Sequence, residues 1–159
     1  MRLTLSVCFL AVSLLAPPVA QAAESVKLAV MYFENAGNPE LEMLRVGLAQ
    51  MLISDLSAEK RFEVVERTRI NELLAELDLQ KTAAVDQDTA VNLGRIIGAR
   101  YMILGSYFEV MGQLRVDARV VDVETSRVVS VGARQAATDL WALHDLMVAA
   151  IADAVADAE

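Results

Sequence analysis

Residues 101–134 read YMILGSYFEVMGQLRVDARVVDVETSRVVSVGAR. Between residues 114 and 120 apolar side chains alternate with charged ones, which is the period-2 pattern of a strand with one buried and one solvated face. Breaks at Met111-Gly112 and at Glu124-Thr125-Ser126 are short enough for antiparallel hairpins. The stretch therefore predicts three consecutive strands, over residues 101–110, 113–123 and 127–134.

The residues before this stretch predict alternating strands and helices. A β-rich run at 26–33 ends in the turn residues 34–38, and a short strand is expected at 62–65. Asn38 has the character of an N-cap, and Gly98 suits a left-handed helix end. Apolar residues at helical spacing predict helices over about 39–57, 68–79, 86–97 and, after the three strands, 139–156 with Thr138 or Asp139 as its cap.

The order of these elements predicts the fold class. Right-handed crossovers in the first half, followed by a meander, are typical of a mixed sheet that is covered by helices. We therefore expect one α/β domain of three layers, with a mixed five-stranded sheet and helices on both faces.

The first 22 residues have the features of a cleavable export signal. Met1-Arg2 gives a positive start, residues 3–16 form an uncharged apolar run, and Ala20-Gln21-Ala22 predicts cleavage after Ala22. The alternative is an anchor that stays uncleaved. Cleavage leaves residues 23–159 without a cysteine, because Cys8 lies inside the signal. Too few residues precede Cys8 for a lipid-attachment signal.

Charge and hydropathy exclude several classes of protein. The chain has 22 acidic and 14 basic residues, a formal net charge of -8, which becomes about −9 once Arg2 is removed with the signal. A nucleic-acid-binding protein needs clustered Lys and Arg to neutralise phosphates. The mean hydropathy is high, +0.40, yet no stretch after the signal approaches the roughly 18 to 20 apolar residues of a spanning helix. We expect at most peripheral association with the outer membrane.

Residue chemistry gives little support to catalysis. His144 is the single histidine, and it is expected to be a structural residue at the surface of the last helix or partly buried there. No Gly-x-Ser-x-Gly elbow and no metal-ligand spacing occur, and Asp86 and Asp88 suit a helix start better than a calcium site. Arg115, Asp117 and Arg119 are expected to lie on the solvent-exposed face of their strand and to form charge pairs across the hairpin. We assign no catalytic, cofactor-binding or metal-binding residue and no cofactor.

The last helix is apolar on two sides, so it either lies between layers or presents one side to another protein. The candidate partner-contact residues are Leu140, Trp141 and Met147 on this helix, together with Glu34, Asn35 and Asn38 in the turn after the first strand. Trp141→Asp is expected to disrupt either folding or self-association.

Several segments resemble the curli production assembly/transport component (CsgG-like) family when their order and spacing are taken together. They are Phe33-Glu34-Asn35, Gly47-Leu48-Ala49, RFEVVER at 61–67, Leu73-Leu74-Ala75-Glu76, GARYMILGS at 98–106 and ARVVDVET at 118–125. The likeness covers about residues 27–136, and the helix at 139–156 follows it. It implies a domain similar to the amino-terminal domain of TolB and to anticodon-binding domains, in an envelope protein without catalysis.

Two departures limit what the resemblance implies. Members of the family that form the curli secretion channel are lipoproteins with long hairpins, whereas this chain has a tight turn at Met111-Gly112-Gln113. We therefore expect a periplasmic, non-enzymatic accessory or adaptor in cell-envelope assembly or curli-type secretion, without a membrane pore of its own. Its partners would be other envelope or secretion proteins, or further copies of the chain. The alternatives are a regulator that docks on an envelope enzyme such as a peptidoglycan synthase, and a carboxylate-dependent hydrolase.

Overall fold

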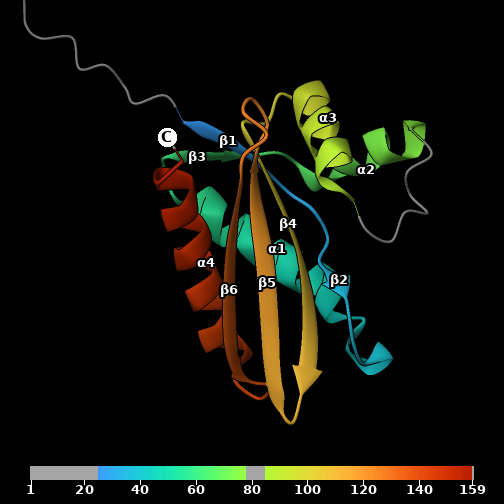
Figure 1. Cartoon of the computed structure of the whole chain (residues 1–159), viewed down its shortest axis with the longest axis vertical. Coiled ribbons are helices and arrows are strands. Elements are labelled where there is room, and N and C mark those ends of the chain that lie inside the picture. Colours follow the sequence, from blue (N-terminus) through green and yellow to red (C-terminus); the bar gives the residue numbers. More distant parts are fainter. Residues whose placement is uncertain (1–24, 78–84, 159) are drawn as a thin grey trace, which may run out of the picture.

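The computed structural model describes residues 25–77 and 85–158, in which one mixed sheet is flanked by helices (Figure 1). The predicted export signal and the end of the second predicted helix lie outside these residues. The sheet order is β3-β1-β4-β5-β6, with β1 parallel to both neighbours and the last two pairings antiparallel. The strands are β1 Val26–Val30, β3 Phe62–Val64, β4 Tyr101–Val110, β5 Gln113–Asp122 and β6 Val128–Ala136. The predicted mixed sheet of five main strands is confirmed.

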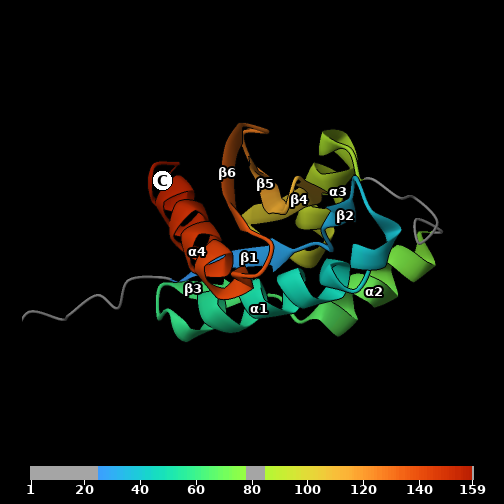
Figure 2. The ribbon, with the colours of Figure 1, turned by 90° about the horizontal axis from the view of Figure 1, so that it is seen from below.

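Helices cover the two faces of this sheet (Figure 2). Alternate residues of β4 face opposite sides: Tyr101 and Ile103 belong to one buried cluster, and Met102 and Leu104 belong to the other. The first cluster lies under α1 and α4, and the second lies under α2 and α3. The helix bounds are α1 Leu44–Ala58, α2 Arg67–Glu76, α3 Gln87–Ile97 and α4 Leu140–Ala156.

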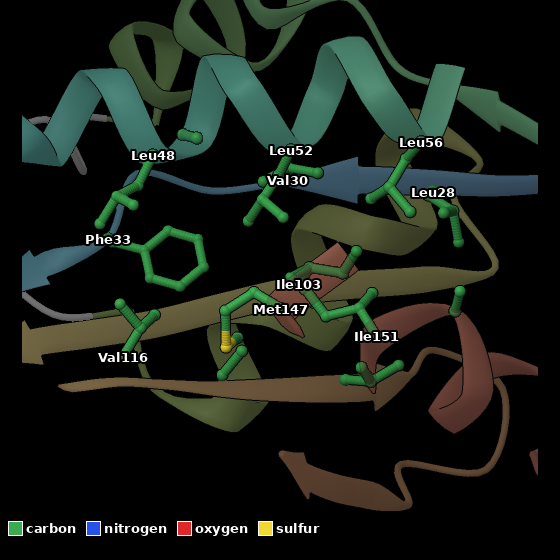
Figure 3. Close-up of a cluster of buried hydrophobic side chains, with 14 of the residues drawn as sticks. Leu28, Val30, Phe33, Leu48, Leu52, Leu56, Ile103, Val116, Met147 and Ile151 are labelled. Atoms are coloured by element: carbon green, nitrogen blue, oxygen red, sulfur yellow. The ribbon is translucent and has the colours of Figure 1, made fainter. Parts of the chain in front are cut away.

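The first cluster is the larger of the two, and Figure 3 shows how it is built. Leu48, Leu52 and Leu56 recur along one side of α1 and point toward β1. Met147 and Ile151 approach from α4, because the 3.6-residue period of that helix puts them on one side. The apolar spacing of α1 therefore predicted its buried side, whereas α4 is apolar on two sides and buries the one that carries Met147 and Ile151.

The helix caps follow the sequence closely. The Asp86 carboxylate accepts the Thr89 N–H at 2.7 Å, and this hydrogen bond holds the pKa of Asp86 below its ordinary value. Gly98 ends α3 in the left-handed conformation, with φ of +70°. The Asp139 carboxylate accepts the Ala142 N–H at the start of α4, so Asp139 is the cap.

Two features near residue 34 differ from the prediction. Glu34–Asn35, expected in a turn, forms a two-residue strand β2 that runs parallel to β4. The helix expected from residue 39 begins as a separate 3₁₀ turn, η1 Pro39–Leu41, and α1 starts only at Leu44. Asn38 is nevertheless the predicted cap, because its side chain accepts the Glu40 N–H at 3.0 Å.

Tyr107 binds the chain at the point where the helix is interrupted. Its hydroxyl donates to the Leu41 carbonyl at 2.9 Å, and that carbonyl would accept the Arg45 N–H in a continuous α-helix. The Arg45 N–H bonds instead to the Glu42 carbonyl, in the tighter 3₁₀ pattern. Burial raises the pKa of Tyr107, which keeps the hydroxyl a donor.

Tyr107→Phe is expected to lower the free energy of unfolding by about 1 kcal/mol, because the Leu41 carbonyl loses its partner. Tyr101→Phe is the matched control: Tyr101 is equally buried, and its hydroxyl has no hydrogen-bond partner among the described residues. Chemical denaturation of both variants measures the difference. An equal loss from the two variants would contradict the assigned role of Tyr107.

The β5–β6 turn is organised by the buried carboxylate of Asp122. It accepts the Glu124 N–H at 2.8 Å, the Thr125 N–H at 2.9 Å and an Arg100 guanidinium N–H at 3.0 Å. Burial alone would raise the pKa of Asp122, but the hydrogen bonds from Thr125 and Glu124 and the charge of Arg100 hold it below its ordinary value. The carboxylate therefore acts as a charged anchor for this turn.

Candidate interaction surface

The predicted partner-contact residues fall into two separate regions. β2 and the turn after it lie on one side of the molecule, and α4 lies on the other, in both views (Figures 1 and 2). The structure therefore does not bring the two groups together into one site.

The asparagines after β1 are engaged in local structure. Asn35 Nδ2 donates to the Asn38 carbonyl at 2.9 Å, and Asn35 Oδ1 accepts the Gly37 N–H at 3.0 Å. Asn38 in turn caps η1. These contacts give both asparagines a role in shaping the turn, whereas the Glu34 side chain lines a groove beside β4.

The three residues predicted on α4 have different surroundings. Met147 is only 2% exposed and lies in the first cluster, so the prediction that it contacts a partner is wrong. It shares the side of α4 that carries Leu143 and Ile151, and this side faces the sheet. Leu140 is half-buried against the same cluster, but Trp141 is 73% exposed.

Exposed apolar residues occur at the β4–β5 turn and at the start of α4. Val110 and Met111, at the β4–β5 turn, are 53% and 97% exposed. The Ala137 N–H donates to the Gly112 carbonyl at 2.9 Å, which ties the segment leading into α4 to this turn. Val110, Met111 and Trp141 are called the tip surface below.

Sequence reasoning missed two of the three tip residues. Met111 and Gly112 both have positive φ, +52° and +73°, as a tight type I′ hairpin requires. The prediction of a tight turn is thus confirmed. An apolar residue in such a turn must point into solvent, and this signal could have identified Met111.

Two predictions about charged side chains need correction. Arg115 pairs with Asp117 along β5, with nitrogen–oxygen distances of 2.7 to 3.0 Å, rather than across a hairpin. The cross-strand neighbours of Arg115 are Phe108 and Arg134, and neither is acidic. His144 is more deeply buried than expected, with Nδ1 lying 3.5 Å from Asp55 Oδ2 of α1.

The carboxyl end of β1 is filled by the chain's own side chains. This is the position at which open α/β sheets bind ligands. The centroid of the Tyr32 ring lies 3.6 Å from the guanidinium carbon of Arg67 and 5.5 Å from that of Arg45. Arg67 also donates to the Val30 carbonyl at 2.9 Å, and burial lowers the Arg67 pKa.

Across residues 25–77 and 85–158, no cluster of three or more His, Cys, Asp or Glu side chains is arranged to hold a metal ion. In that same part of the chain, no helix has the length and apolar character needed to cross a membrane.

Comparison with known proteins identifies the family. The family model described as "Curli production assembly/transport component CsgG" matches residues 13–112, well over half of the chain. The chain belongs to the CsgG family. The matched segment begins and ends earlier than the 27–136 expected from the motifs. No curated protein matches the chain by sequence.

Solved structures confirm the fold of this CsgG-family chain. The LpoB C-terminal domain from Salmonella enterica has a TM-score of 0.62 and 17% identity, over 74% of this chain and 87% of that one. Lipoprotein GNA1162 from Neisseria meningitidis has a TM-score of 0.55 and 17% identity, over 82% and 96%. TolB from Acinetobacter baumannii has a TM-score of 0.56 and 14% identity, over 83% and 28%. At these identities the likeness establishes the fold, including the expected TolB-like architecture.

Proposed function

We propose that this protein is a non-enzymatic periplasmic accessory or adaptor that acts through protein contacts in envelope assembly or curli-type secretion. The observation that carries the proposal is membership of the CsgG family, whose description names assembly and transport. Its likeness in fold to a protein described as a lipoprotein, GNA1162, supports an envelope role. The export signal predicted over residues 1–22 supports a periplasmic location.

The tip surface is the contact region that fits this function best. Aromatic and methionine side chains are enriched at the centres of protein interfaces, where they supply large contact area. Met111 and Trp141 are 97% and 73% exposed. They lie at a helix start and in a tight turn.

The proposal is tested by fractionation and affinity capture of the tagged full-length protein. The expected result is a periplasmic protein that begins at Ala23 and that recovers envelope assembly or secretion proteins after cross-linking. Recovery of a peptidoglycan synthase instead would favour the alternative of an enzyme regulator. A cytoplasmic location, or turnover of glycan or ester substrates that is lost when an Asp or Glu is replaced, would contradict the proposal.

Combining Met111→Asp with Trp141→Asp is expected to reduce partner capture about tenfold, because two apolar contacts are replaced by charges that must be desolvated. The melting temperature should stay close to that of the native protein, since both side chains are largely in solvent; of the two effects expected above for Trp141→Asp, the loss of folding is therefore no longer expected. Ile96→Asp is the control, because Ile96 is an exposed apolar residue on α3. Equal capture by the native protein, the double variant and Ile96→Asp would show that the tip surface does not contact the partner.

A further inference from the structure

Part of the sheet has no helix over it. In Figure 1 the lower halves of β4, β5 and β6 face the viewer without a helix in front of them. Burial agrees with this view: on this face, Val121 near the end of β5 is buried under α3, whereas Arg115 and Arg119 are exposed. A groove of about 460 Å³ runs over this open face, and its lining includes Glu34, Ser106, Arg119 and Ser130.

The open face carries an ordered pattern of charge. Arg115, Asp117 and Arg119 follow one another at two-residue steps on β5, so their side chains lie on the same face in the order positive, negative, positive. The step between successive side chains is about 6.8 Å in an antiparallel strand. With Glu34 at its wall, the groove lining carries two basic and two acidic side chains, so the order of the charges distinguishes this groove and not their sum.

The neighbouring strand adds a third arginine beside the groove. Arg134 of β6 lies directly opposite Arg115, and like charges in that position destabilise a sheet. Among the described residues, neither Arg119 nor Arg134 forms a salt bridge. An external carboxylate placed between Arg115 and Arg134 would relieve their repulsion.

Gly132 shapes the floor of the groove. It lies opposite Asp117, and a Cβ at this position would come within 2.6 Å of Asp117 Oδ1. The same Cβ would lie 3.5 Å from an Arg115 guanidinium nitrogen. The Arg115–Asp117 pair thus lies over the glycine, where no side chain fills the centre of the groove, and Arg119 and Arg134 lie on either side of the pair.

We infer that this face, here called the arginine groove, binds an extended acidic segment of a partner protein, with acidic, basic and acidic side chains at positions i, i+2 and i+4. The acidic side chains would meet Arg119 and the Arg115–Arg134 pair, and the central basic side chain would meet Asp117. Side chains two residues apart in an extended segment have the same spacing as those of β5, so all three contacts form in one register.

The mixed charge selects a polypeptide over a uniform polyanion. Asp117 at the centre of the groove and Glu34 at its wall repel an anionic membrane or an acidic polysaccharide. In a second copy of the chain, β6 supplies no match, because Val128–Ala136 contains no acidic residue. Glu59, Arg61 and Glu63 do follow the acidic, basic, acidic order, but Glu59 already pairs with Arg61 and Glu63 with Lys27 within the chain. The inference rests on the proposed function only in assuming a protein partner.

The test uses the purified protein and synthetic peptides. Fluorescence anisotropy compares a nine-residue extended peptide carrying Glu, Lys and Glu at i, i+2 and i+4 with a peptide carrying Lys, Glu and Lys at the same places. We expect the first to bind at least about tenfold more tightly, the equivalent of one lost charge-assisted contact. The affinity should fall as salt is raised, because the arginines are exposed.

Variants locate the site. Arg119→Gln and Arg134→Gln should each weaken binding of the first peptide severalfold, and Arg69→Gln, an exposed arginine on α2, should leave it unchanged. Thermal melts check that each variant is folded. The inference would be overturned if the two peptides bound equally tightly, or if polyglutamate or anionic vesicles bound as tightly as the first peptide. It would also be overturned if the first peptide did not bind, or if it bound both groove variants as tightly as the native protein. Because no cell partner is involved, this result is independent of the capture experiment.

Discussion

Gly105→Ala is expected to lower the free energy of unfolding by about 3 kcal/mol, at the upper end of the cost of overfilling a core. A Cβ at position 105 would lie 2.2 Å from Phe33 Cε1 and 2.6 Å from the Asp117 carbonyl oxygen. The Phe33 ring is fully buried in the first cluster, so it has no solvent to move into, and the carbonyl belongs to the neighbouring strand. Urea denaturation measures the loss.

Gly47→Ala is the control for this prediction. Gly47 lies within α1, and a Cβ there would meet nothing within 4 Å. The same substitution should therefore raise stability by about 0.5 to 1 kcal/mol, because alanine favours a helix over glycine. If both substitutions changed the free energy of unfolding in the same direction, the close packing of Phe33 on β4 would be refuted.

Asp122→Ala is expected to cost about 3 kcal/mol, because it removes three hydrogen bonds to a charged group and leaves the half-buried Arg100 without one of its carboxylate partners. The exposed Asp88→Ala is a suitable control, since Asp88 does not cap α3. Losses of equal size from the two variants would show that the β5–β6 turn does not depend on the carboxylate.

The contribution of Asp122 to the free energy of unfolding should also depend on pH. Its pKa is depressed in the folded protein, so the stabilisation is complete above the unfolded pKa of about 4 and is lost as the pH falls through the folded value. Below about pH 4, the free energy of unfolding of the native protein should therefore fall more steeply than that of Asp122→Asn. Parallel pH profiles for the two proteins would contradict this role of the charge.

The elements that sequence predicted best are those governed by local chemistry. The hairpin at Met111-Gly112 and the ends of α3 follow from turn and cap residues within a few positions. The break between η1 and α1 could not be predicted in this way. It coincides with a hydrogen bond from Tyr107, which lies 66 residues from its acceptor Leu41.

The contact surface was only partly predictable for a related reason. Trp141 and Met147 both lie on apolar stripes of the same helix, and helical spacing alone does not say which stripe meets the sheet. The position of β6 and α1 decides it, burying Met147 and leaving Trp141 in solvent. The arginine groove needed the strand register, because only the register brings Arg134 opposite Arg115.

The central claim is that the protein acts in the periplasm through its tip surface. Photocross-linking in living cells tests it most directly, with a photoreactive residue placed at position 111 or 141, or at position 96 on α3 as the control. The account predicts adducts with envelope assembly or secretion proteins from positions 111 and 141 and none of these adducts from position 96. Identical adducts from all three positions, adducts with cytoplasmic proteins, or no adduct from either tip position would contradict it.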